Sequence, residues 1–525
     1  MTVLYNGNII TMTEAGTVQA LGFENGKIVF VGDDEQAMKL DADNRIDLQG
    51  KTLLPGFHDG HMHMANYGCM AESVTLFDCK SAEECVKKAK VYLDAHPDVP
   101  YLFARGFNED YYAEKRYPTM EELDSISDTI PVTMVRVCGH VSVCNSYAID
   151  KIKKLPQAAA LEDQIIDGRL YEYAVDLFGM ILPKPDLKAV QRKLLAAMKD
   201  MNACGITACQ TDDFCSIAGA DDRMIIAAFR DLEQKGLMTL RVYEQCLFTS
   251  KPPFDRFLSD GNRTGMGSDL FRIGPLKLLQ DGSLGAKTAL LRAPYKDSDS
   301  CGIANFTQDE LDEMVLTAQK HDMQIAVHCI GDGALEMTLE ALEKADAQYP
   351  RKDAKNGIVH VQITDRPLLE RMKADDLVAY IQPVFVDYDM DIADKRVRGD
   401  LSEIYAWKTM EERGILTVGG SDSPVESFDI LNNIYYAVTR EHLSGGPEGG
   451  WMPHQKVDVM TALRMFTLNP AKACFAEEKI GSIAVGKYAD FAVLEDDPTK
   501  VEAHRIKDIK VLATVLEGKT VYGNF

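Results

Sequence analysis

Three histidines fall within six positions of one short, mostly apolar stretch, "LLPGFHDGHMHM" (residues 53–64), although the chain has only eleven. Because the side chains of a β-strand alternate between its two faces, His61 and His63 point to one side and His58 has the opposite parity. We expect Gly60 to break the strand locally. Two imidazoles one strand repeat apart can chelate a metal ion, but polar residues that merely end a strand would show the same spacing. The rest of the chain must supply the missing ligands.

Four further polar residues stand where buried strands are expected to end. Lys277 lies in "GPLKLLQDG", His328 in "MQIAVHC", His360 in "NGIVHVQ", and Asp422 directly after "ILTVGGS". Each has an ordinary alternative. The histidines could be core residues bonded to carbonyls, Asp422 could cap a helix, and Lys277 could extend to water. A buried, neutral lysine amine can instead react with carbon dioxide to give a carbamate, an anionic ligand that suits two divalent cations.

These residues are positioned by short apolar runs that alternate with helix-like stretches. This alternation is typical of βα units and a parallel sheet, and residues 307–322 form a clear amphipathic helix pattern. The runs cover residues 52–63, 205–210, 239–245, 273–279, 323–329, 356–362, 377–383 and 415–421. Eight such strands predict an α/β fold, the (β/α)8 TIM barrel, whose working residues gather at the C-terminal ends of the strands.

The remaining segments predict two additions to the barrel. Residues 65–200 separate the first two strands and are too long for a simple connection, so we expect an inserted subdomain after strand 1. The ends of the chain, 1–54 and 476–525, read as short alternating strands, with a type I′ hairpin expected at residues 24–27. Neither end has enough strands to bury a sheet face alone. We therefore expect both to form one small β domain, which leaves residues 55–475 for the barrel and its insertion.

Composition excludes several classes of partner. The net charge of −24 over 525 residues repels phosphate backbones and anionic lipid, so we expect no nucleic acid and no membrane among the partners. No apolar run is long enough to span a bilayer, and the N-terminus lacks a signal-peptide pattern. The twelve cysteines show no C-x-x-C spacing, which favours free thiols in the cytoplasm.

Several segments together resemble the amidohydrolase superfamily, and more narrowly the branch that contains the N-substituted formamide deformylases. They are "PGFHDGHMHM", "KLLQDGSLGAKTA", "AVHCIGD", "IVHVQ", "GGSDSPVES", "GSIAVGKYADFAVLEDDP" and, in the insertion, "RVCGHVSVCNSYAI" and "DGRLYEYA". The resemblance implies a metal-dependent barrel and a β-sandwich built from both termini. At His58 relatives usually carry an aliphatic residue, and we expect this histidine to be a packed neighbour of the site.

The resemblance also implies a ligand set for two divalent metal ions, for which we expect Zn²⁺. The ligands would be His61, His63, Lys277, His328, His360 and Asp422. His61 and His63 would hold the more buried ion and His328 and His360 the more exposed one. Lys277 would carry a CO2-derived carbamate that bridges the two.

The implied function is metal-dependent hydrolysis of a C–N bond in a small amide, formamide or cyclic amide by a metal-bridging hydroxide. Asp422 would transfer the proton. His140, in "CGHVSVCN", would be a second catalytic group, or else a hydrogen-bonded loop histidine, and Asp281 is a weaker candidate for substrate contact. The alternatives are a mononuclear-metal deaminase of the same fold, which usually lacks a lysine at position 277, and a non-catalytic scaffold, which would have lost ligands. We expect a homodimer.

Overall fold

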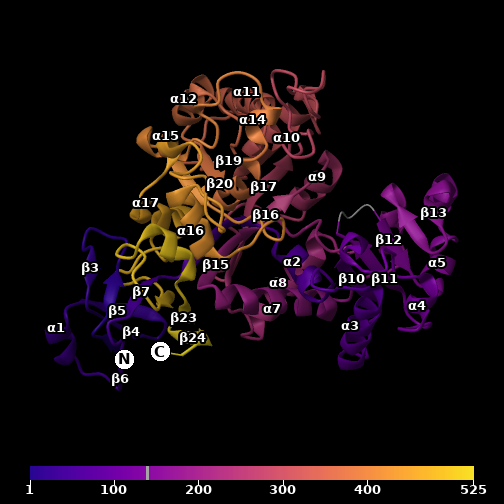
Figure 1. Ribbon diagram of the computed structural model, residues 1–525. Helices are drawn as coiled ribbons and strands as arrows, with labels where there is room; N and C mark the ends of the chain where they lie inside the picture. Colours follow the sequence, from indigo (N-terminus) through magenta and orange to yellow (C-terminus); the bar gives the residue numbers. More distant parts are fainter. Residues whose placement is uncertain (138–140, 525) are drawn as a thin grey trace. The chain divides into compact units, whose positions relative to one another are not determined.

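The computed structural model of the chain describes residues 1–137 and 141–524. It contains two compact units, which we describe separately (Figure 1). The barrel unit comprises Met1–Met64, Ala197–Cys215 and Ile225–Phe525. The insert unit comprises Ala65–Ala196 and Ser216–Met224.

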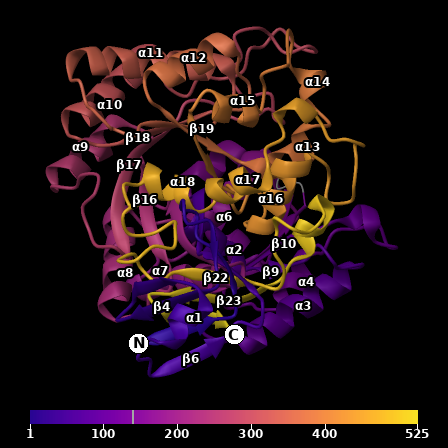
Figure 2. The ribbon, with the colours of Figure 1, turned by 90° about the vertical axis from the view of Figure 1, so that its left-hand side faces the viewer.

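Eight parallel strands of the barrel unit form one nearly closed sheet in the order of the chain. They are β8 (Phe57–Met62), β15 (Ile206–Thr211), β16 (Arg241–Leu247), β17 (Phe271–Leu279), β18 (Ile325–Cys329), β19 (Gly357–His360), β20 (Val378–Ile381) and β21 (Leu416–Gly419). Each of the eight predicted runs therefore contains one strand of the barrel. Helices α10 (Gln308–Lys320) and α11 (Asp332–Gln348) pack beside β18 (Figure 2). The predicted amphipathic helix is α10, and it starts with a capping box between Thr307 and Glu310.

The seam between β21 and β8 is held by backbone hydrogen bonds just beyond the end of β21. The Asp422 N–H donates to the His61 carbonyl (2.8 Å), and the His63 N–H donates to the Ser423 carbonyl (2.7 Å). A Cβ atom on Gly420 would lie 2.6 Å from the His61 nitrogen, so only glycine lets the two segments come this close. Gly60 lies inside β8, so the prediction that it breaks the strand is wrong, although the register with β15 shifts near it.

The first predicted run is in fact two strands that belong to different sheets. β7 (Thr52–Pro55) joins a sheet of the chain termini, and β8 begins after Gly56. A Cβ atom on Gly56 would lie 2.1 Å from the Thr207 Oγ1 atom. The apolar run thus continues from one sheet into the next because both strands are wholly buried.

The two ends of the chain build two further sheets of the barrel unit. One has the order β5-β4-β1-β6 and the other the order β24-β23-β22-β7-β2-β3. Their strands are β1 (Thr2–Tyr5), β2 (Asn8–Ile10), β3 (Thr17–Val18), β4 (Ala20–Glu24), β5 (Lys27–Gly32), β6 (Asn44–Asp47), β22 (Phe491–Leu494), β23 (Val511–Leu516) and β24 (Lys519–Gly523). The expected hairpin joins β4 and β5 with positive φ at Asn25 and Gly26. One apolar core, including Leu21 and Phe491, is shared by both sheets.

The insert unit is a mixed six-stranded sheet with helices of its own. The order is β13-β14-β12-β11-β10-β9, with β9 (Val74–Thr75), β10 (Leu102–Phe107), β11 (Val132–Arg136), β12 (Val141–Cys144), β13 (Ile165–Ile166) and β14 (Arg169–Tyr171). Helix α3 (Ala82–Ala95) contributes Cys85 and Ala89 to an apolar core with this sheet. His140 lies outside the described residues. None of the described helices combines the length and the apolar composition that crossing a bilayer requires.

Candidate metal centre

His61 lies near the C-terminal end of β8, and His63 follows directly after this strand. His61 is 1% exposed, and its Nδ1 atom pairs with Gln245 Oε1 at 2.7 Å, which leaves Nε2 directed at the neighbouring groups. Burial, reinforced by the Lys277 charge, lowers the pKa of His61. Its imidazole is therefore neutral, which is the form that binds a metal ion.

Asp422 lies three residues after the end of β21 and contacts both histidines. Its Oδ1 atom lies 3.1 Å from His61 Nε2 and 3.0 Å from His63 Nε2. Burial opposes ionisation of this carboxyl group, but the hydrogen bonds with His61 and His63 outweigh burial and hold its pKa well below the usual value. Asp422 is therefore an ionised carboxylate in contact with the two histidines of the HxH motif.

Lys277 is completely buried on β17 and forms an ion pair that the sequence did not suggest. Its Nζ atom lies 3.1 Å from Asp212 Oδ2 and 3.4 Å from His61 Nε2. The other carboxylate oxygen of Asp212 contacts His63 Nδ1. Burial disfavours the charge on Asp212, but His63 and Lys277 overcome it and keep the pKa of the carboxyl group well below its usual value. The only signal in the sequence was a pair of consecutive aspartates directly after the buried second strand.

His360 and His328 complete the predicted set, on the neighbouring strands β19 and β18. His360 Nδ1 pairs with Gln382 Oε1 at 2.7 Å, and burial, followed by the charge of His328, lowers the pKa of His360 well below its usual value. The His328 ring lies 4.3 Å from the His360 ring. Its Nε2 atom is 3.1 Å from the Gly282 carbonyl oxygen and 3.3 Å from Asp281 Oδ1.

Asp281 orders the loops around His328. Its carboxylate accepts backbone N–H bonds from Leu290 (2.9 Å), Ile330 (3.1 Å) and Gly331 (2.8 Å). It is 3% exposed. These three hydrogen bonds give Asp281 a structural role, so its presence at this position does not require a contact with substrate.

The donor set fits divalent transition metals. In each of two groups of three residues, every residue offers one ligand atom, and these atoms lie within 4.8 Å of one another. The groups are His61, His360 and Asp422, and His61, His63 and Asp212. Neutral imidazoles with carboxylates are ligands that zinc, iron, manganese and cobalt accept. The structure thus brings five predicted ligands together with Asp212, and places His328 beside His360. His58 lies apart, at the other end of β8.

Comparison with known proteins assigns the chain to the family that its sequence motifs resemble. The family model described as "Amidohydrolase family" matches residues 45–522, so the chain belongs to this family. The "Putative amidohydrolase YtcJ" of Bacillus subtilis is 30% identical over 99% of both chains. The "N-substituted formamide deformylase" of Arthrobacter pascens is 24% identical over 99% of this chain and 98% of that protein.

A solved structure agrees with the assignment. An uncharacterized metal-dependent hydrolase from Pyrococcus furiosus superimposes with a TM-score of 0.81 at 27% identity, covering 95% of this chain and 100% of the other. The expected resemblance to the amidohydrolases is confirmed, and the chain is a hydrolase of that family.

Proposed function

We propose that this protein hydrolyses a C–N bond of a small amide-type molecule with two divalent metal ions, Zn²⁺ being the first candidate. The observation that carries the proposal is the convergence of His61, His63, His360, Asp422 and Lys277 on one end of the barrel. All of these residues have donor atoms that suit a metal ion, or a modification that would make one. A scaffold protein would have no need to keep them together.

Two glutamines position the histidines for this task. Gln245 and Gln382 each pair with an Nδ1 atom, on His61 and His360 respectively, and so direct the Nε2 atoms toward the centre of the rim. Outer contacts of this kind fix the orientation of ligand side chains. When bound, divalent ions would lower the pKa of a water molecule and polarise a carbonyl group.

Asp422 is the residue to which we assign proton transfer. Its carboxylate is ionised and lies 3.1 Å from His61 Nε2 and 3.0 Å from His63 Nε2, so it can accept a proton from the attacking water. It would deliver that proton to the departing amine. His140 stays a proposed second catalytic group.

Lys277 is the residue to which we assign the carbamate. Its Nζ atom is 0% exposed and reaches His61 Nε2 at 3.4 Å, so a carboxylate group added there would lie among the ligands. In the unmodified side chain the ammonium group is paired with Asp212, and this pair must open before the amine reacts. A mononuclear deaminase is the alternative, since His61, His360 and Asp422 alone could hold one ion.

The test is a substrate screen with protein of known metal content. Formamides, N-acyl amino acids and cyclic ureas should be compared, with formamides first because of the deformylase relative. We expect amine release that follows metal content up to two equivalents, and loss of activity in Lys277→Ala. Full activity with one equivalent of bound metal, or full activity of the Lys277→Ala variant, would favour the mononuclear deaminase instead.

The remaining expectations also stand as proposals. We propose that the terminal sheets form the β-sandwich of the family and that residues 65–200 form its inserted subdomain. We also propose a cytoplasmic homodimer. The described cysteines are all free thiols, which is compatible with a reducing compartment.

A further inference from the structure

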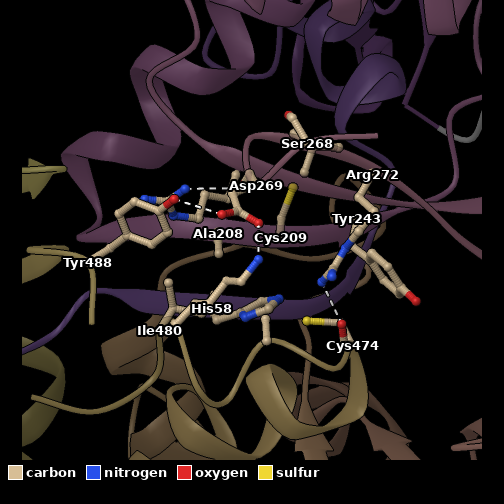
Figure 3. A pocket seen from close by; sticks show the side chains of 14 residues that line it. His58, Ala208, Cys209, Tyr243, Ser268, Asp269, Arg272, Cys474, Ile480 and Tyr488 are labelled. Carbon is tan, nitrogen blue, oxygen red and sulfur yellow. Dashed lines mark hydrogen bonds and ion pairs between the residues drawn. The ribbon is translucent and has the colours of Figure 1, made fainter. Parts of the chain in front are cut away.

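A cavity, which we call the floor cavity, lies at the N-terminal ends of the barrel strands. Its volume is about 30 Å³. Its lining includes His58 of β8, Tyr243 of β16 and Arg272, the second residue of β17 (Figure 3). Cys474 and Lys479 line it from the segment after α18 (Leu468–Ala473). The Lys479 side chain is 47% exposed, so this part of the lining also faces solvent.

His58 brings unused hydrogen-bonding capacity to this cavity. The residue is 3% exposed, and neither Nδ1 nor Nε2 has a partner among the described residues. Burial, with a smaller contribution from the Arg272 charge, lowers the pKa of His58 to about 3. The ring is therefore neutral and offers one N–H donor. A buried polar group without a partner is costly, so a ligand or water is expected beside it.

Arg272 brings a positive charge that no carboxylate balances. Within the part of the chain that the structure describes, no carboxylate oxygen lies within 4.0 Å of its guanidinium group. Its Nη2 donates to the Cys474 carbonyl oxygen (2.6 Å), and the group lies 5.1 Å from the centre of the Tyr243 ring. Figure 3 shows the Arg272 side chain extending to Cys474.

The other charged groups around the cavity are paired with one another. Arg241 pairs with two carboxylates, its Nε lying 2.7 Å from Asp490 Oδ2 and its Nη2 3.0 Å from Glu517 Oε1. Lys479 Nζ lies 2.6 Å from Asp269 Oδ1. Among the charged residues that line the floor cavity, Arg272 is therefore the one for which the described part of the chain offers no ion-pair partner.

We propose that the floor cavity binds one small monovalent anion, of the size of chloride to formate, between the Arg272 guanidinium and the His58 N–H. The charge of Arg272 selects an anion. The single cation favours a single negative charge. The cavity volume, about that of two water positions, excludes larger anions. Apolar walls such as Ala208 and Ile480 lower the local dielectric and so strengthen the attraction.

Thermal unfolding of the full-length protein in different sodium salts at constant ionic strength tests this site. A ligand that binds only the folded state raises Tm by mass action. We expect a saturable rise with chloride, bromide and formate and none with gluconate, which is too large to enter. The rise should vanish in Arg272→Gln and persist in Lys519→Gln, which removes the same charge from exposed β24. An equal response to gluconate, or an unchanged response in Arg272→Gln, would mean that water alone fills the cavity.

A second measurement keeps the proposal testable if Arg272→Gln does not fold. Crystals of the unmodified protein, equilibrated with bromide at the midpoint of the Tm response, should show an anomalous peak between His58 and Arg272. A cavity without that peak overturns the proposal. Because the floor cavity uses none of the proposed metal ligands, these results are independent of the catalytic assignment.

Discussion

The ion pair between Lys277 and Asp212 makes the unmodified enzyme depend on Asp212 for its stability. Both side chains are 0% exposed, and 3.1 Å separates the Nζ and Oδ2 atoms. In the Asp212→Asn variant, the Lys277 ammonium group would contact a neutral amide and would lose its negatively charged partner. Removing one partner of a buried ion pair costs about 3–5 kcal/mol, and we expect the lower end because asparagine can still accept one hydrogen bond. That is a large part of the 5–15 kcal/mol that typically stabilises a folded protein.

Urea unfolding of metal-free protein in CO2-depleted buffer measures this effect. We expect Asp212→Asn to unfold at a clearly lower urea concentration than the parent, and Asp41→Asn, a substitution at an exposed site, to match the parent. After loading with bicarbonate and Zn²⁺ the difference should shrink, because a carbamate on Lys277 needs no anionic partner. Equal midpoints for parent and Asp212→Asn in the metal-free state would refute the reasoning, since Lys277 would then carry no charge that needs Asp212.

Three further predictions address other parts of the barrel unit. Arg241→Met should lower the free energy of unfolding by about 3–5 kcal/mol in a denaturant titration, because it leaves buried Asp490 without this ion-pair partner. A double variant that also removes the charge of Asp490 should recover part of this loss. Burial raises the pKa of Asp389 to about 6, so its ionisation destabilises the fold increasingly as pH rises from about 4 to above 6. Asp389→Asn should then raise Tm at pH 8 and leave it nearly unchanged at pH 4. In Gly420→Ala the new methyl group meets the His61 nitrogen at 2.6 Å, and zinc affinity in a competition titration should fall about 10–100-fold, as for disturbed outer contacts of metal ligands.

The barrel could be predicted because parallel strands covered on both faces read as continuous apolar runs. The same property hid the boundary at Gly56. The apolar run continues across this residue, although β7 and β8 belong to different sheets. The close approach of Gly420 to His61 was equally invisible, because it depends on how the first and last barrel strands meet.

The ligands could be predicted where a histidine or a lysine is out of place in an apolar run. Asp212 could not, because an aspartate after a strand is also a normal turn or cap residue, and only the register of β15 against β8 shows that it meets His63. Gln245 and Gln382 lie inside or beside buried strands, but their sequence does not reveal which imidazole they pair with.

The seam that joins Asp422 to His61 has a consequence for biosynthesis. Residues at opposite ends of the barrel sequence, 361 positions apart, must meet before either can share an ion with the other. A nascent chain that has released only the first strands from the ribosome holds an incomplete set of donors. The proposed ligand group that includes Asp422 is therefore complete only in chains whose last barrel strand has been translated and docked.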